Sequence, residues 1–117
     1  MKKRTLTFAK DIISFCISLP KNQEVGLIKN QLFRSGTSVG ANYRAACRAR
    51  SKKEFIAKLG IVEEEADETL YWLELLKVLI PKIAEKIQTL EKECDELLSI
   101  VISSIKTARK NLSKSNP

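Results

Sequence analysis

Apolar residues recur at steps of three and four along the last third of the chain. They are Ile83, Ile87, Leu90, Cys94, Leu97, Val101, Ile105, Ala108 and Leu112. A stripe with this spacing, kept over about four heptads, is typical of an amphipathic helix on the seam of a helical bundle. The stripe needs other helices to cover it, so the chain is expected to be all-α.

Three further segments have the same periodicity. Together the four segments predict helices over about 5–19, 24–50, 52–80 and 82–112. Asn22 and Ser51 are predicted N-caps, and Glu54 completes a capping box with Ser51. Pro81 either ends the third helix or begins the fourth. Because 117 residues fit one domain, we predict a single antiparallel up-down four-helix bundle over residues 1–117.

Residues 34–42, inside the second predicted helix, include two glycines and three hydroxyl residues that weaken a helix. The apolar spacing keeps its phase through the segment, so we predict a continuous helix and not a turn. Gly36 and Gly40, four residues apart, then share a face that a neighbouring backbone can approach closely. Phosphate binding by this segment is disfavoured, because the Walker spacing and a preceding strand are absent.

The third predicted helix carries a run of carboxylates. They are Glu63, Glu64, Glu65, Asp67 and Glu68. Bundle metal sites of the di-iron type use Glu-x-x-His motifs, and the chain has no histidine, so no metal is expected. We interpret the run as a solvated face or an interface with a basic neighbour. Arg34 and Asn42 of the second helix are predicted to find partners among these carboxylates, such as Glu68.

The net charge of +7 is unevenly distributed along the chain. Residues 1–58 hold 13 Lys and Arg against 3 Asp and Glu, whereas residues 59–117 hold 8 against 11. The candidate nucleic-acid-binding residues surround the connection between the second and third helices: Arg44, Arg48, Arg50, Lys52, Lys53 and Lys58. Such a patch can hold RNA or DNA phosphates without reading bases. A solubilising surface that meets the acidic run of an adjacent subunit is the alternative left open.

Three more cations, Lys106, Arg109 and Lys110, lie near the end of the fourth helix and are interpreted as complementing its dipole.

From residue 70 to residue 80 the third helix is apolar on nearly every side. A peripheral helix of a small bundle cannot bury all of its sides, so a second subunit is expected to cover one of them. The predicted oligomer-interface residues are Tyr71, Trp72, Leu75 and Leu79. Base stacking by these aromatic residues is disfavoured, because leucines surround them.

The composition disfavours the common kinds of catalysis. Without histidine the chain lacks the usual general base and the usual partner of a serine or cysteine nucleophile. Cys16, Cys47 and Cys94 are too widely spaced for a zinc site and are predicted to be buried free thiols. No apolar run or signal segment points to a membrane, so a cytoplasmic location is expected. We therefore expect a protein that is not an enzyme and has no catalytic residue, metal or cofactor.

Three segments together resemble a known family. They are residues 31–43 (QLFRSGTSVGANY), 49–59 (ARSKKEFIAKL) and 68–73 (ETLYWL). The chain resembles the four-helix-bundle proteins encoded by intervening sequences of bacterial 23S rRNA genes. The resemblance implies a left-handed bundle, assembly as a homopentameric ring and no established catalytic activity. It also implies distant kinship with accessory proteins of diversity-generating retroelements, whose basic ring surfaces bind nucleic acid and a reverse transcriptase.

One position departs from this family, which usually has an acidic residue where this chain has Ala45. A polar network that depends on that carboxylate is therefore not expected here. The sequence and the resemblance together predict a non-enzymatic, ring-forming homo-oligomer that binds RNA or DNA through its basic surface. A protein-binding adaptor without nucleic-acid contact is the alternative.

Overall fold

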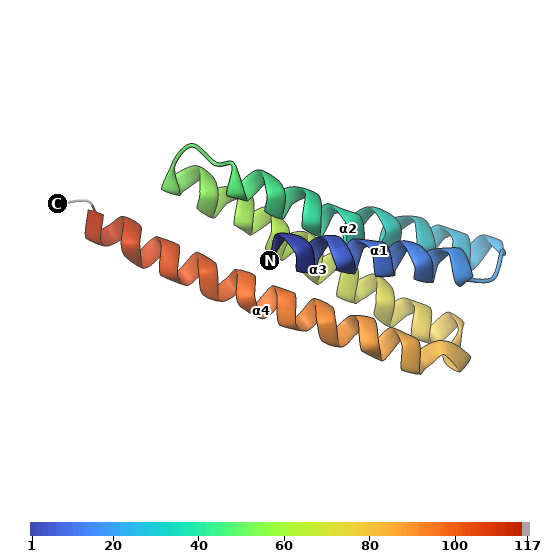
Figure 1. Ribbon diagram of the computed structural model, residues 1–117. Coiled ribbons are helices and arrows are strands. Elements are labelled where there is room, and N and C mark those ends of the chain that lie inside the picture. The colour runs from blue at the N-terminus through green and yellow to red at the C-terminus, as the bar shows by residue number, and fades with distance from the viewer. Residues whose placement is uncertain (116–117) are drawn as a thin grey trace.

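The computed structural model describes residues 1–115, which form four long helices and no strand. The helices are α1 (Lys2–Ser18), α2 (Gln23–Cys47), α3 (Lys52–Leu79) and α4 (Ala84–Ser115), with a short 3-10 turn, η1 (Pro81–Ile83), before α4. Each short connection reverses the chain, so that consecutive helices lie side by side in opposite directions (Figure 1). The prediction of an all-α four-helix fold is confirmed.

Local capping explains where three of these elements begin. The Asn22 side chain accepts a hydrogen bond of 2.9 Å from the Val25 backbone N–H, and the Ser51 hydroxyl accepts one of 3.1 Å from that of Glu54. Both predicted N-caps are thus confirmed. Pro81 is the first residue of η1 and therefore begins a new element. The N–H at that position makes no hydrogen bond within a helix, so its absence in proline costs nothing there.

The second helix ends earlier than predicted. α2 stops at Cys47, three residues before the predicted end at Arg50, because Arg48 already has non-helical dihedrals of −101° and 8°. The chain then has to reach Ser51 in an extended conformation, with φ of −151° and ψ of 163°, so that Ser51 can cap α3. α1, in contrast, begins three residues before the predicted start, at Lys2.

The predicted apolar stripes meet in one core that all four helices share. Its largest fully buried apolar side chains are Phe8, Ile12, Leu32, Leu59, Leu73, Leu76, Ile87 and Leu97. α1 packs on α2, α2 on α3 and α3 on α4, while α1 and α4 share the smallest contact. The bundle is therefore weakest in apolar packing along its α1–α4 side.

Arg4 closes this α1–α4 side with ion pairs. Its Nε and Nη2 atoms each donate a 2.8 Å hydrogen bond to the carboxylate of Glu93, and Nη2 lies 3.5 Å from Glu96. Such a two-pronged contact is the strongest geometry for an arginine and a carboxylate. The hydrogen bond from Arg4 lowers the pKa of the Glu93 carboxyl below its usual value, so Glu93 stays charged at neutral pH.

Gly36 and Gly40 lie where α2 passes closest to α1. A Cβ atom on Gly36 would lie 2.9 Å from two side-chain carbons of Ile12, and one on Gly40 would lie 3.2 Å from the Thr5 carbonyl oxygen. At Gly26 and Gly60 the same atom would meet nothing within 4 Å. The close approach of two helices thus accounts for the glycines of residues 34–42, through which α2 runs without a break.

The helices differ in length, and this shapes the two ends of the 57 × 21 × 19 Å molecule. α1 has 17 residues and α4 has 32. Figure 1 shows that α1 begins well short of the α2–α3 connection, whereas α4 extends past it. That end of the molecule is consequently built from α2, α3 and α4 without α1.

The cysteines show the effect of this arrangement. Cys16 and Cys94 are buried free thiols as predicted, and burial raises their pKa values to about 11 and about 12. The prediction for Cys47 is wrong, because this free thiol is exposed. Cys47 is the last residue of α2 and lies more than one turn after Gly40, which packs against Thr5 near the start of α1. α1 therefore does not reach far enough to cover the thiol.

Among residues 1–115, no helix is both long and apolar enough to cross a membrane.

Candidate nucleic-acid interface

The connection between α2 and α3 gathers the predicted cations, which we call the basic hairpin: Arg44, Arg48, Arg50, Lys52, Lys53 and Lys58. Four of the six, together with Ala41, Ala45 and Glu54, line one open hollow of about 450 Å³; they are Arg44, Arg48, Arg50 and Lys58. The other two, Lys52 and Lys53, are exposed in the first turn of α3. The fold thus brings cations of two helices to one surface.

The chain itself does little to neutralise this surface. Glu54 is the one carboxylate of the hollow, and its Oε2 atom accepts a 3.1 Å hydrogen bond from the Arg50 backbone N–H. Within residues 1–115, the side chains of Arg44, Arg48 and Lys58 form no ion pair. By contrast, three cations in the body of the bundle are paired: Arg4 with Glu93 and Glu96, Arg34 with Glu65 and Glu68, and Lys77 with Glu91.

Helix stability accounts for only part of the basic hairpin. Arg44 lies in the last turn of α2, where a cation interacts favourably with the helix dipole. Lys52 and Lys53 lie in the first turn of α3, where the dipole is positive and a cation is unfavourable by about 0.3–1 kcal/mol. The helix dipole therefore does not account for these two lysines.

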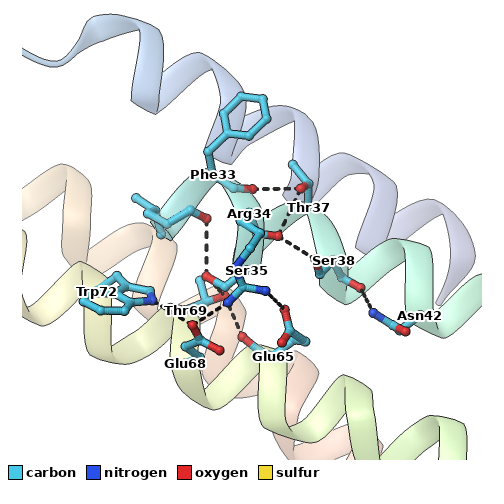
Figure 2. A network of polar contacts seen from close by, with 11 residues as sticks. Phe33, Arg34, Ser35, Thr37, Ser38, Asn42, Glu65, Glu68, Thr69 and Trp72 are labelled. Atoms are coloured by element: carbon cyan, nitrogen blue, oxygen red, sulfur yellow. Dashed lines mark hydrogen bonds and ion pairs between the residues drawn. The ribbon is translucent and has the colours of Figure 1, made fainter. Parts of the chain in front are cut away.

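A polar network joins the middle of α2 to α3 (Figure 2). Arg34 donates a 3.0 Å hydrogen bond to Glu65 through Nη1, and its Nη2 atom donates to Glu68. Glu68 also accepts a 3.2 Å hydrogen bond from the indole N–H of Trp72. The contact with Arg34 lowers the pKa of the Glu68 carboxyl. The prediction that Arg34 finds its partners among the α3 carboxylates, such as Glu68, is confirmed. Glu65 lies three residues before Glu68 and therefore shares its helix face.

The hydroxyl residues of this region are satisfied within the bundle. The buried Thr69 hydroxyl lies 3.0 Å from that of Ser35 and donates a 2.7 Å hydrogen bond to the Glu65 carbonyl oxygen. The predicted carboxylate partner of Asn42 is wrong, because its amide donates to the Ser38 carbonyl oxygen of its own helix at 2.9 Å (Figure 2). Residues 34–42 therefore serve helix packing and hold no free loop for a phosphate.

The outer side of α3 beyond this network exposes apolar surface. Of the predicted interface residues, Tyr71 and Leu79 are 55% and 43% exposed, and Trp72 and Leu75 are half-buried. Val78 is 75% exposed on the same helix. The Tyr71 and Trp72 rings contact each other edge to face, with centroids 5.0 Å apart.

In the part of the chain that the structure describes, His, Cys, Asp and Glu side chains form no group of three that could hold a metal ion.

The fold and these surfaces define a small four-helix-bundle protein whose distinctive features are a cationic end and an exposed apolar face on α3. The chain belongs to the family of 23S rRNA-intervening sequence proteins, whose family model matches residues 1–103. Among solved structures, it is similar to a protein with unknown function from the S23 ribosomal protein family of Bacteroides thetaiotaomicron VPI-5482. The two are 39% identical with a TM-score of 0.83, over 90% of this chain and 97% of that chain. Among curated proteins, none matches the chain.

Ala45, the position at which the resemblance leads us to expect an acidic residue, lies in the basic hollow. It is eleven residues and about 16 Å along α2 from Arg34, which α3 carboxylates already hold. A carboxylate at residue 45 is thus not needed for Arg34. With alanine at this position, Glu54 is the one carboxylate among the described residues that line the hollow.

Proposed function

We propose that this protein is a non-enzymatic homo-oligomer that binds RNA or DNA phosphates through the basic hairpin. The observation that carries the proposal is that Arg44, Arg48 and Lys58, which form no ion pair within residues 1–115, lie together at one end of the bundle. Carboxylates hold Arg4 and Arg34 in the body of the bundle. Unpaired cationic side chains neutralise phosphates without reading the base sequence.

The non-enzymatic part of the proposal rests on composition and burial. The chain has no histidine, and the raised pKa values of Cys16 and Cys94 keep both thiols protonated at neutral pH. The descriptions of the family and of the similar structure name no reaction. Binding is therefore the function that these residues support.

Neutralising three cations of the hollow is expected to weaken binding of a short RNA duplex by about tenfold or more at about 100 mM salt. This hairpin variant carries Arg44→Gln, Arg48→Gln and Lys58→Gln. Because each lost phosphate contact also removes released counterions, the slope of log K against log salt is expected to become shallower. Fluorescence anisotropy titrations between about 50 and 200 mM salt measure both quantities.

A matched control separates local contact from net charge. The control variant carries Lys82→Gln, Lys86→Gln and Lys92→Gln, which lower the net charge by the same amount at the opposite end of the bundle. It is expected to bind within about threefold of the unchanged protein. Equal binding by both variants, or no binding of any RNA or DNA at low salt, would refute the proposal.

Self-association is supported by the apolar surface of α3. Tyr71 and Leu79 are exposed beside half-buried Trp72 and Leu75, and Glu64 and Asp67 on the same helix are exposed carboxylates that the cations of a neighbouring subunit would complement. The family resemblance suggests five subunits. The proposal is thus a ring in which this face is covered.

In solution, the unchanged protein is expected to have about five times the 13.2 kDa mass of one chain. Tyr71→Glu combined with Leu79→Glu is expected to reduce the mass to that of a monomer, because it places charges in an apolar interface. Ile17→Glu on α1 is the control, since Ile17 is 77% exposed outside the proposed interface. Light scattering after size-exclusion chromatography measures the mass. A monomeric unchanged protein would contradict this part of the proposal.

A protein-binding adaptor is the second candidate, and the exposed apolar residues Tyr71, Val78 and Leu79 favour it. In that case the hairpin variant would keep its partner, and the double change at Tyr71 and Leu79 would lose it. Capture of the same protein partner after nuclease treatment, with no measurable RNA or DNA binding, would favour the adaptor over the nucleic-acid binder.

A further inference from the structure

A second group of cations lies at the end of α4. After Glu96 the helix contains no Asp or Glu, and the cations Lys106, Arg109, Lys110 and Lys114 follow. We call these four residues the basic α4 end. All four side chains are exposed, and within residues 1–115 none of them forms an ion pair.

The helix dipole does not explain at least two of these four cations. Its effect falls off within the last turn of a helix. α4 ends at Ser115, so Lys106 lies nine residues and Arg109 six residues before the end. Both are more than one turn of 3.6 residues away. The interpretation that Lys106, Arg109 and Lys110 complement the dipole is therefore insufficient for at least the first two.

The fold places the basic α4 end beside the basic hairpin. Figure 1 shows the end of α4 at the same end of the molecule as the α2–α3 connection, where α1 is absent. Phe55 of α3 lines a hollow together with Ser103 and Thr107 of α4, and Lys58, one turn along α3, lines the basic hollow of the hairpin. The basic hollow and the hollow beside α4 thus lie on either side of the first turns of α3, although their residues are distant in sequence.

The surface on the α4 side also carries polar side chains that can bind a nucleic-acid backbone. Ser103 and Thr107 offer hydroxyl groups there, and Lys106 and Lys110 are their neighbours along the helix. Hydroxyl and cationic side chains both hydrogen-bond to the phosphates and sugars of nucleic acids. Among the residues that the structure describes, none that lines this hollow carries a carboxylate.

We propose that the basic α4 end is the second half of the phosphate-binding surface, and that this surface binds the backbone of double-stranded nucleic acid. The inference rests on the proposed function and specifies its ligand. A duplex carries about one negative charge per 1.7 Å of its axis and presents two phosphate strands, which suits cations arriving from two separate helices.

The aromatic residues argue for a duplex over a single strand. Proteins that bind single strands stack the bases on aromatic side chains set among cations. Here Tyr43 and Phe55, the aromatic residues closest in sequence to the basic hairpin, are partly buried against the core. Tyr71 and Trp72 lie about 27 Å along α3 from Lys53, and the Trp72 N–H is bonded to Glu68. A base leaving its stack would find no free aromatic platform at this end.

The test compares three variants that each remove three positive charges. The α4 variant carries Lys106→Gln, Arg109→Gln and Lys110→Gln, and the hairpin and control variants are those defined above. Each is titrated with an RNA duplex, a DNA duplex of the same sequence and one of the RNA strands alone. We expect the α4 variant to bind both duplexes at least about tenfold more weakly than the unchanged protein. For the DNA duplex, the slope of log K against log salt is expected to become shallower by about 0.9 for each lost phosphate contact.

The outcomes separate this inference from the proposed function. If the hairpin variant binds weakly but the α4 variant binds like the control variant, the proposed function stands and the role of the α4 end is overturned. If the single strand binds as tightly as the duplexes, the duplex preference is overturned. If no nucleic acid binds at low salt, both proposals fail. Circular dichroism melting of each variant shows whether the bundle remains folded, and Lys106→Gln alone supplies the comparison if the triple change unfolds it.

Discussion

Gly36→Ala is expected to destabilise the protein by about 1–3 kcal/mol, although alanine is the better helix former. The new methyl group would lie 2.9 Å from two side-chain carbons of Ile12, well inside the 3.5–4.0 Å at which carbon atoms attract. Ile12 is fully buried and cannot turn towards solvent. The overpacking therefore outweighs the gain of about 1 kcal/mol in helix propensity.

The same change at Gly60 is the matched control. Gly60 lies within α3, and a Cβ atom there would meet nothing within 4 Å, so Gly60→Ala is expected to stabilise the protein by up to about 1 kcal/mol. Urea unfolding at one fixed protein concentration measures both changes, since association would otherwise shift the apparent stability. Equal stabilisation by both alanines would show that α1 does not approach α2 as closely as the structure indicates.

Phe8→Ala is expected to lower the free energy of unfolding by about 3–5 kcal/mol, a large part of the 5–15 kcal/mol typical of a domain. Phe8 is 1% exposed and is the largest fully buried side chain that α1 contributes, since Phe15 is 7% exposed. α1 has only 17 residues, and an isolated helix of that length is marginal in water, so α1 depends on packing for its stability. Removing the phenyl ring leaves a cavity in the core that the helices share.

Leu6→Ala tests whether this effect comes from burial. Leu6 lies two residues away on the same helix and is 43% exposed, so its truncation is expected to cost less than about 1 kcal/mol. The difference between the two denaturation midpoints is the informative quantity. A similar loss for both variants would mean that Phe8 is not in the core or that α1 frays as a whole.

The local features of this fold could be predicted because they depend on residues close in sequence. The hydrogen bond from the Val25 backbone N–H to Asn22 and that from Glu54 to Ser51 each span three residues, and residue type is enough to identify them. The four-residue spacing of Gly36 and Gly40 likewise defines a shared helix face without reference to any partner. What lies against that face, Ile12 and Thr5 of α1, could not be predicted from the spacing.

The candidate site was predictable only in part. The six cations of the basic hairpin cluster in sequence, so a basic patch could be expected without a structure. That Arg44, Arg48 and Lys58 form no ion pair within residues 1–115 could not be expected, because it depends on where the carboxylates lie in space. Glu65 and Glu68 are held by Arg34, and Glu93 by Arg4 across 89 residues of sequence.

The sequence alone determined that the chain forms four amphipathic helices, where most of them begin, and that positive charge surrounds the α2–α3 connection, because periodicity, capping and composition act over a few residues. Only the tertiary structure decided how far each helix reaches. The short α1 leaves Cys47 exposed and one end of the bundle open, and the long α4 carries Lys106 and Arg109 to that same end. The physical reason is that the position of each helix along the bundle axis is set by its packing against helices that are distant in sequence.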